Sequence, residues 1–206
     1  NQLWVADITY IMLNNGDVCY LHLITDAYSR MIVGWELADT LRASITIKAL
    51  EQAISQTGGV SLEDLTHHSD RGVQYCCDDY VRMLQTHKIK ISMTEDYNPT
   101  DNAIAERANG VIKTETVYSR KTFNSLEHAR NVIGRFIHFY NYRRPHMSIG
   151  YKIPAVVHTE TGAQKKMWKK KNYPKKAYNN GNNGISLPCR TTGADDGCNH
   201  HTVYSI

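Results

Sequence analysis

Three acidic residues stand out because they break the local sequence pattern. Asp7 interrupts the apolar, β-prone segment 3–13, and a buried carboxylate costs several kcal/mol unless it is paired or binds a cation. Asp70 ends a short predicted strand, and Glu106 lies in the first turn of a predicted helix. Carboxylates from three different elements can hold two Mg²⁺ ions, which prefer oxygen ligands. Two such ions, about 3.5–4 Å apart, promote attack on a phosphodiester and stabilise its leaving oxygen.

Each acid also has an ordinary structural explanation. Asp70 precedes Arg71-Gly72, and a turn residue is the simplest explanation of Asp70 taken alone. The helix dipole favours an acid such as Glu106 in the first turn of a helix. Asp7 is the hardest of the three to explain without function. The chemistry therefore depends on whether the fold brings the three side chains together.

The pattern of elements favours an α/β fold. The turn Asn14-Asn15-Gly16-Asp17 predicts a hairpin, because Asn and Gly tolerate positive φ. Three antiparallel strands followed by alternating strands and helices predict a five-stranded mixed sheet with helices on both faces. The predicted strands cover residues 3–13, 18–25, 31–38, 64–69 and 88–93, and the predicted helices cover residues 43 to the Gly58-Gly59 pair, 78–87 (with Val81 and Leu84 inward), about 102–118, and about 125–142.

The helix that carries Glu106 has a polar face with further candidates. Asn102 is expected to cap this helix, and it is also a candidate DNA contact. Lys113 follows Glu106 by two helical turns, where it would contact a phosphate beside the metal ions. The apolar stripe of the same helix consists of Ile104, Ala108, Val111 and Ile112.

The last predicted helix ends in a basic segment. Asn124 and Glu127 are expected to form the capping box at its start. Arg143, Arg144 and His146 follow its end as candidate DNA contacts. A helix C-terminus also favours positive charge, so a purely structural role explains them equally well.

The excess positive charge of the chain is concentrated at its C-terminal end. The 206 residues include 24 Lys+Arg and 20 Asp+Glu, of which residues 164–206 hold eight and two. Such a lysine-rich run suits phosphate contacts, and charge alone fits a solvated tail equally well. The low-complexity segment 178–184 predicts disorder from about residue 164. We therefore divide the chain into a domain over residues 1–158 and a basic, low-complexity tail over residues 159–206.

Several other classes of protein and site are disfavoured. No apolar run approaches the roughly 18 residues of a membrane span, and the first residues lack a secretory signal pattern. No Gly-rich P-loop is present, which argues against a nucleoside triphosphatase. Five cysteines without a regular framework indicate reduced thiols in a cytosolic protein. Zinc is not expected at His67-His68, nor at Cys189, Cys198, His200 and His201.

Four segments carry a resemblance to a known family. They are Trp4-Val5-Ala6-Asp7-Ile8-Thr9-Tyr10, His68-Ser69-Asp70-Arg71-Gly72-Val73-Gln74-Tyr75, Asp101-Asn102-Ala103-Ile104-Ala105-Glu106-Arg107 and Tyr140-Asn141-Tyr142-Arg143-Arg144-Pro145-His146. In this order, with 35 residues between Asp70 and Glu106, the chain resembles the integrase-like core of DDE transposases of bacterial insertion sequences. The likeness is greatest to the OrfB-type members, relatives of retroviral integrases, and it covers about residues 2–158.

The resemblance implies a fold, a chemistry and partners. It implies an RNase H-like fold in which Asp7, Asp70 and Glu106 bind two Mg²⁺ ions, with Mn²⁺ as a substitute. It further implies cleavage of a DNA strand by water, followed by strand transfer by a DNA 3′-hydroxyl. The expected partners are the ends of a mobile element, target DNA and further copies of the chain, acting in the bacterial cytoplasm at the nucleoid.

Two other functions stay open from the sequence. The chain would act as a non-catalytic DNA-binding remnant of a transposase if the three carboxylates lay too far apart to share metal ions. An RNase H-like nuclease would use the same fold and metals. Only the resemblance of the segments around Glu106 and Arg143 disfavours this nuclease.

Overall fold

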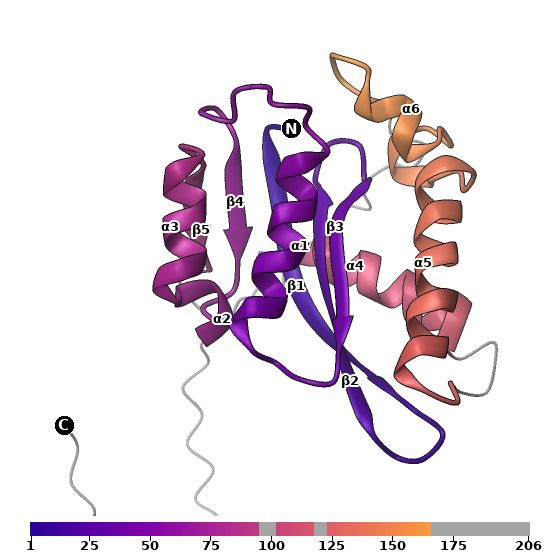
Figure 1. The fold of residues 1–206 in the computed structure, drawn as a ribbon. Helices are drawn as coiled ribbons and strands as arrows, with labels where there is room; N and C mark the ends of the chain where they lie inside the picture. Colours follow the sequence, from indigo (N-terminus) through magenta and orange to yellow (C-terminus); the bar gives the residue numbers. More distant parts are fainter. Residues whose placement is uncertain (95–101, 118–122, 166–206) are drawn as a thin grey trace, which may run out of the picture. The chain divides into compact units, whose positions relative to one another are not determined.

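The structure is a computed structural model that describes residues 1–94, 102–117 and 123–165. Its centre is a five-stranded sheet in the order β3-β2-β1-β4-β5 (Figure 1). The first three strands are antiparallel, whereas β1, β4 and β5 are parallel, so the predicted mixed sheet is confirmed. The strands are β1 (Leu3–Met12), β2 (Val18–Asp26), β3 (Ile32–Ala38), β4 (Thr66–Ser69) and β5 (Lys90–Met93).

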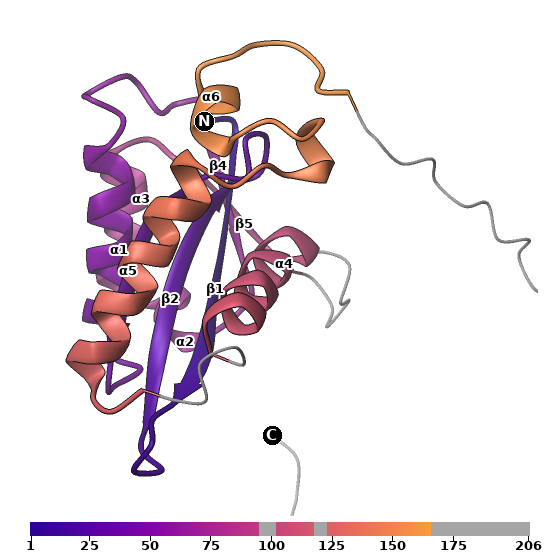
Figure 2. The ribbon, with the colours of Figure 1, turned by 90° about the vertical axis from the view of Figure 1, so that its right-hand side faces the viewer.

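Helices cover both faces of this sheet, as Figure 2 shows most clearly. One face packs against α1 and α3 around the buried side chains of Trp4 and Leu50. The other face packs against α4 and α5 around Leu23 and Ile133. No helix in the described ranges is long and apolar enough to cross a membrane. The main helices are α1 (Ala43–Ser55), α3 (Asp78–Thr86), α4 (Ala103–Ile112) and α5 (Leu126–Tyr142).

The central strand β1 separates the two cores residue by residue. Successive side chains of a strand point to opposite faces, so Trp4 and Ala6 enter the core beneath α1. Asp7 therefore points to the opposite face, which α4 covers. The predicted first hairpin is present: the Leu13 backbone N–H donates to the Asp17 carbonyl at 2.8 Å, and Gly16 has a φ of 88°.

Two short α-helices were not predicted, in addition to the 3₁₀ helix Met147–Ile149. The two α-helices are α2 (Val73–Cys76), shortly after Asp70, and α6 (Pro154–His158), near the end of the described chain. Four or five residues are too few to show a helical period, which explains why the sequence pattern missed them. In α3 the prediction that Val81 points inward is wrong in degree, because Tyr80 and Leu84 are the buried residues of this helix.

The predicted capping box of the last helix is wrong by one residue. Ser125, not Asn124, is the N-cap of α5, and its hydroxyl accepts a hydrogen bond from the His128 backbone N–H. The His128 ring nitrogen Nδ1 in turn accepts a hydrogen bond from the Asn124 backbone N–H at 3.2 Å. A histidine thus replaces the glutamate of the usual motif, so Glu127 has no part in it.

The first residues that we assigned to the tail contact the folded domain. The Tyr28 hydroxyl donates to the Gly162 carbonyl at 2.8 Å and accepts from the Gln164 side chain at 2.7 Å. Residues 166–206, which include the lysine run and the cysteines and histidines considered for zinc, lie outside the described residues. The predicted disorder and the tail boundary stay predictions.

Gly34 of β3 is required for the close approach of α1 to the sheet. A Cβ atom built on Gly34 would lie 2.1 Å from the Ala49 carbonyl oxygen. We expect Gly34→Ala to lower the free energy of unfolding by about 2–4 kcal/mol, because the helix or the strand must shift. Urea denaturation measures this loss. The matched control is Gly110→Ala in α4, where nothing meets the new Cβ and stability is expected to rise by up to about 1 kcal/mol.

Candidate active site

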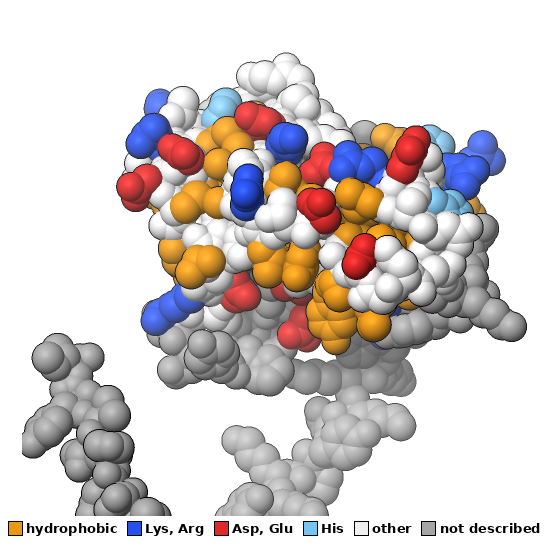
Figure 3. Space-filling view, turned by 60° about the horizontal axis from the view of Figure 1, so that its bottom comes forward, with side chains coloured by type: hydrophobic (Ala, Val, Ile, Leu, Met, Phe, Trp, Pro, Cys, Tyr) orange, Lys and Arg blue, Asp and Glu red, His pale blue; other side chains and the backbone are white. Residues whose placement is uncertain are grey.

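The parallel pairing of β1 with β4 places Asp7 beside Asp70. Val5 is the register partner of His68, and two further residues along each strand lead to Asp7 and Asp70. Parallel strands end at the same edge of a sheet, which is where open α/β sheets place their ligands. Asp70 therefore lies directly after the end of β4, and Asp7 lies beside it within β1. Figure 3 shows the molecule with the lower side of Figure 1 turned forward, where acidic side chains are interspersed with hydrophobic ones.

Helix α4 is fastened to β1 at the position of Asp7. The Asn109 side-chain amide donates to the Asp7 carboxylate at 2.7 Å, and the Asn102 amide donates to the Ala6 carbonyl at 2.9 Å. Glu106 lies one turn before Asn109, on the same side of the helix. The backbone of Asn102 is the N-cap of α4, but its side chain does not cap, which corrects that part of the prediction.

Sequence reasoning missed Asn109, although its spacing was a usable signal. It follows Glu106 at the i+3 position and is 5% exposed, despite being polar. A buried amide needs hydrogen-bond partners, and one of them here is the Asp7 carboxylate. Asn109 therefore fixes the position of the carboxylate that the strand buries.

The electrostatics of Asp7 show that the three acids interact. Burial is the largest effect and raises the pKa of Asp7 to about 6, while hydrogen bonds from Asn109 and from the Ile8 backbone N–H lower it. The charges of Asp70 and Glu106 both raise this pKa further. Three carboxylates from β1, from the end of β4 and from α4 thus share one region of negative potential, which a cation would relieve.

The donor set fits a hard divalent cation better than a soft one. All three candidate ligands are carboxylates, whose oxygens suit Mg²⁺. Asp70 and Glu106 are exposed, and one Asp70 oxygen accepts from the Gly72 backbone N–H at 2.9 Å. Within the described residues, no three His, Cys, Asp or Glu side chains are close enough together to form a ready metal cluster. Metal binding would therefore require the two exposed carboxylates to approach Asp7.

A hollow of about 250 Å³ lies beside Asp70. Gln74 and Tyr75 from α2 line one part of it, and Tyr10 and Tyr20 from the first hairpin line another. Tyr75 is buried, whereas Tyr10 is 61% exposed. Aromatic rings at a surface can stack against nucleotide bases. The sequence analysis did not single out these tyrosines.

Models of one known protein family match most of the described residues. Two family models described as Integrase core domain match the chain, one over residues 1–99 and the other over residues 87–154. The chain belongs to the integrase core family. Together the two matches include all three acids and most of the described residues.

Curated relatives of this integrase core are transposases of bacterial insertion sequences. This chain is 36% identical over 168 residues to the transposase assigned to insertion sequence element IS986/IS6110 of Mycobacterium tuberculosis. The aligned residues cover 80% of this chain and 60% of the relative. The chain is 32% identical to the transposase for insertion sequence element IS629 of Shigella sonnei, covering 75% of this chain and 51% of the relative. The transposase InsF for insertion sequence IS3A of Escherichia coli is also 32% identical, over 73% of this chain and 51% of the relative. The chain thus spans between half and 60% of the length of these relatives.

Solved structures with the same fold are retroviral integrases. The catalytic core domain of HTLV-2 integrase in complex with magnesium aligns with a TM-score of 0.60 and 21% identity, over 77% of this chain and 96% of that one. The intasome of simian T-cell lymphotropic virus aligns with a TM-score of 0.65 and 21% identity, over 85% of this chain and 60% of that one. At this identity the likeness establishes the fold, and it confirms the predicted RNase H-like architecture.

Lys113 of the integrase core lies close to Asp7. Its ammonium group sits 4.2 Å from the centre of the Tyr10 ring, a cation–π contact that fixes the end of the side chain. Burial lowers the pKa of Lys113, and the Asp7 charge partly offsets this effect. Lys113 ends α4 and begins a short π-helical segment, Lys113–Val117, where the sequence predicted a continuous helix. Its role as a phosphate contact stays a prediction.

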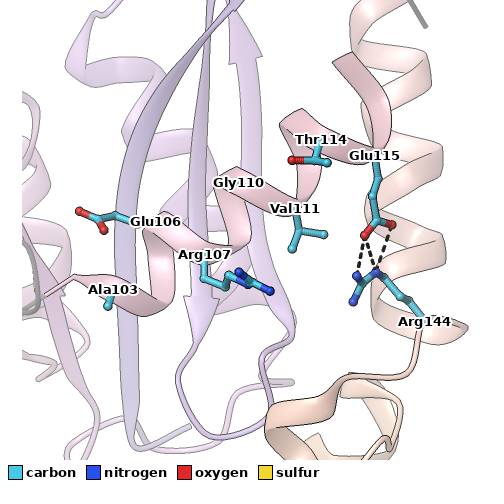
Figure 4. A pocket seen from close by; sticks show the side chains of 8 residues that line it. All are labelled: Ala103, Glu106, Arg107, Gly110, Val111, Thr114, Glu115 and Arg144. Carbon is cyan, nitrogen blue, oxygen red and sulfur yellow. Dashed lines mark hydrogen bonds and ion pairs between the residues drawn. The ribbon is translucent and has the colours of Figure 1, made fainter. Parts of the chain in front are cut away.

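The basic segment after α5 of the integrase core is partly structural. Arg144 binds both oxygens of the Glu115 carboxylate, as Figure 4 shows. His146 is 8% exposed and packs edge-on against Tyr140, with 4.4 Å between the ring centres. Arg143 is exposed at the end of α5. These contacts account for Arg144 and His146 without DNA, and the predicted DNA contacts of all three residues stay predictions.

His67 and His68 each have a partner within the fold. The buried His67 ring hydrogen-bonds to the Tyr80 hydroxyl at 2.9 Å. His68 contacts the Ser92 hydroxyl through Nδ1, also at 2.9 Å. Both imidazoles therefore have structural roles in joining β4 to its neighbours.

Proposed function

We propose that the chain is the catalytic core of a bacterial insertion-sequence transposase, which cuts DNA strands and joins them to a target in a Mg²⁺-dependent reaction. The observation that carries the proposal is that the charges of Asp70, after β4, and of Glu106, on α4, both raise the pKa of Asp7 on β1. Membership of the integrase core family, together with transposase relatives, supports the same chemistry.

The three carboxylates are the proposed metal ligands and catalytic residues. Asp7 is held in place by Asn109, whereas Asp70 and Glu106 are exposed and can approach it. Two bound Mg²⁺ ions, or Mn²⁺ in their place, would supply Lewis-acid stabilisation of the charge that develops on the phosphodiester. In strand transfer a DNA 3′-hydroxyl forms a new bond to phosphorus, and the displaced 3′-oxygen of the target strand leaves.

The residues around the acids would hold the DNA. Lys113 is placed to contact a phosphate of the strand bound beside Asp7, with Tyr10 supporting its side chain. Arg143, Arg144 and His146 are proposed backbone contacts further along the chain. Asn102 would act indirectly, because its side chain fastens α4 to β1.

The proposed partners are mobile-element ends, target DNA and further copies of this chain. The HTLV-2 integrase core domain is described in trimeric and dimeric forms, and the simian viral protein is described as part of an intasome. By analogy we propose self-association of this chain on paired DNA ends. A reaction on chromosomal DNA would take place in the bacterial cytoplasm at the nucleoid.

A strand-transfer assay on a branched DNA oligonucleotide tests the proposal. Such a substrate already presents the reacting 3′-hydroxyl beside a target strand, so it requires little of end recognition. We expect joined product with Mg²⁺ or Mn²⁺, and a loss of at least about 10³-fold in Glu106→Gln, because a metal ligand is removed without a change of shape. Gel analysis of the labelled strands measures it.

Glu127→Gln is the matched control, because Glu127 is also an exposed acid in the first turn of a helix. Its activity is expected to equal that of the unchanged chain. Equal joining by Glu106→Gln would reject the assigned role of Glu106. DNA binding without any joining, in either metal, would instead favour the non-catalytic DNA-binding alternative, which the spacing of the carboxylates in the described residues keeps open.

A further inference from the structure

A second cavity, of about 580 Å³, lies on the side of α4 that faces the segment after α5. Three arginines line it from three different parts of the chain: Arg30 from the turn between β2 and β3, Arg107 from α4, and Arg144 after α5. The aromatic rings of Tyr140 and Tyr151 form further parts of its wall. Arginines brought together from separate elements are typical of a site for a bulky anion.

The charges of the three arginines converge on one point of this cavity. Burial raises the pKa of Tyr140 to about 12, and the charges of Arg144, Arg30 and Arg107 each oppose this rise. The Tyr140 hydroxyl is therefore within electrostatic reach of all three guanidinium groups. The same three arginines also lower the pKa of His146, after the larger effect of burial.

Two polar atoms in the wall of the cavity lack a hydrogen-bond partner. Thr25 is 1% exposed, and its hydroxyl has no partner in the structure. The Nε atom of Arg30 is likewise buried and unpaired. Buried polar groups are normally satisfied by protein, water or ligand. A hydroxyl and a guanidinium N–H are both donors to an anion, so the cavity offers hydrogen bonds as well as charge.

The carboxylates near the cavity leave a positive balance. Both carboxylate oxygens of Glu115 bind Arg144 and neutralise its charge. The negative charge of Asp26 raises the pKa of Arg30 and so stabilises its charged form. Arg107 forms no ion pair within the described part of the chain, and it is exposed to solvent. At least this guanidinium is available to an incoming anion without displacing an acidic partner.

The cavity is also continuous with a groove that leads to the candidate active site. This groove runs along α4, and Ala103, Arg107, Val111 and Arg144 line both hollows. Glu106 lines the groove at its other end, and Figure 4 shows Glu106 and Arg107 extending from α4 in different directions. A DNA strand bound at Glu106 would therefore reach the arginines within a short stretch of backbone.

We infer that this arginine cavity is a phosphate-binding site that is separate from the candidate metal site. Phosphate is favoured over a carboxylate because three guanidinium groups and a hydroxyl supply more donors than two carboxylate oxygens accept. Its source is a backbone phosphate of a DNA strand or free inorganic phosphate, which share this chemistry. Binding of free phosphate does not depend on the proposed strand-transfer function.

Two titrations of the full chain in EDTA test the inference. Inorganic phosphate, followed by ¹H–¹⁵N NMR, is expected to shift the backbone amides of Arg107 and Tyr151 in a saturable manner. A fluorescent single-stranded oligonucleotide of about 15 nucleotides, followed by anisotropy, is expected to bind about 10-fold more weakly to Arg107→Ala. The slope of log affinity against log salt is expected to fall by about 0.7 in this variant, since one phosphate contact is lost.

Arg135→Ala on α5 is the matched control, because Arg135 is an exposed arginine that does not line the cavity. Thr25→Val, which keeps the shape of the side chain, is a second variant and is expected to weaken phosphate binding. Phosphate shifts with weaker oligonucleotide binding in Arg107→Ala support the site with DNA as the source. Phosphate shifts that Arg107→Ala abolishes, with unchanged oligonucleotide binding, support it with free phosphate as the source. Absence of phosphate shifts at the cavity overturns the inference.

Discussion

Replacing Asp7 with asparagine is expected to abolish strand transfer and, in the absence of metal, to make the protein more stable. Activity is lost because the substitution removes the half-buried metal ligand on β1 that lies near Asp70 and Glu106. We expect strand transfer to be slower by at least about 10³-fold. The gain in stability follows from the cost of keeping an ionised carboxylate half-buried beside Asp70 and Glu106.

The pH dependence of this gain is fixed by the direction of the shift. The pKa of Asp7 is raised from 3.8 to about 6 in the folded protein, so its ionised form destabilises the fold above pH 6. The cost disappears below about pH 4, where the carboxyl is protonated in both states. Asparagine keeps only one acceptor for the donors on Asn109 and Ile8, so we expect a net gain of about 1–2 kcal/mol at pH 7.5.

Urea denaturation in EDTA and in Mg²⁺ measures both parts of this prediction. Mg²⁺ is expected to stabilise the unchanged chain, because a ligand that binds only the folded state raises its stability, and to leave Asp7→Asn unaffected. Asp64→Asn serves as the control, since Asp64 is a fully exposed acid outside the site. A metal-free Asp7→Asn protein that is less stable than the unchanged chain would contradict the assigned strain on this carboxylate.

The strands and their succession along the chain could be predicted because the signals that set them are local. Turn residues such as Gly16 and the β-branched runs around them predicted the ends of β1, β2 and β3 to within one residue. The periodicity of α5 predicted its bounds to within one residue, and that of α1 predicted its start, although α1 ends at Ser55, before Gly58. The mixed sheet follows from the succession of strands and helices, which local sequence patterns are sufficient to predict.

The face of α4 was harder to predict, because packing there depends on size as well as polarity. The sequence pattern chose Ile104 and Val111 as inward residues, but both are half-buried and line the arginine cavity. Ala105 and Asn109 are buried instead. A small side chain and a hydrogen-bonded amide allow α4 to lie close to β1, and no hydrophobicity pattern encodes such a contact.

The convergence of the acids also required information beyond the local pattern. The register of β1 with β4 and the bond from Asn109 to Asp7 are both long-range features, which spacing along the chain does not reveal. The local pattern singled out Asp7, Asp70 and Glu106 as candidates, and resemblance to a family grouped them as one metal site. Neither assigned a role to Asn109, Arg30 or Arg107, because only the folded chain places these side chains beside a site or a cavity.

Acid is expected to unfold this protein over an unusually steep range, between pH 6.5 and 4. Three histidines are almost fully buried in the fold: His22, His67 and His146 are 1%, 1% and 8% exposed. Burial is the main cause that lowers the pKa of each from 6.5 to about 4. Since the unfolded chain binds these protons near pH 6.5 and the folded chain does not, stability is complete above pH 6.5 and is lost as the pH falls towards 4. Each histidine contributes about 1–3 kcal/mol to this loss of stability. Protonation of Asp7 in the folded protein opposes the loss by about as much as one histidine contributes.

The slope of stability against pH tests this account independently of the mean stability of any variant. Urea midpoints measured at several pH values between 7.5 and 4.5 are expected to decrease steadily as the pH is lowered in the unchanged chain. In His67→Gln the slope is expected to decrease by about 1.4 kcal/mol per pH unit, because one proton fewer is taken up on unfolding. This holds even though the variant loses the bond to Tyr80 and is less stable overall. His87→Gln at the exposed end of α3 is the control, and its slope should equal that of the unchanged chain. A slope that is the same in His67→Gln and His87→Gln would mean that the buried imidazole of His67 takes up its proton within the folded protein.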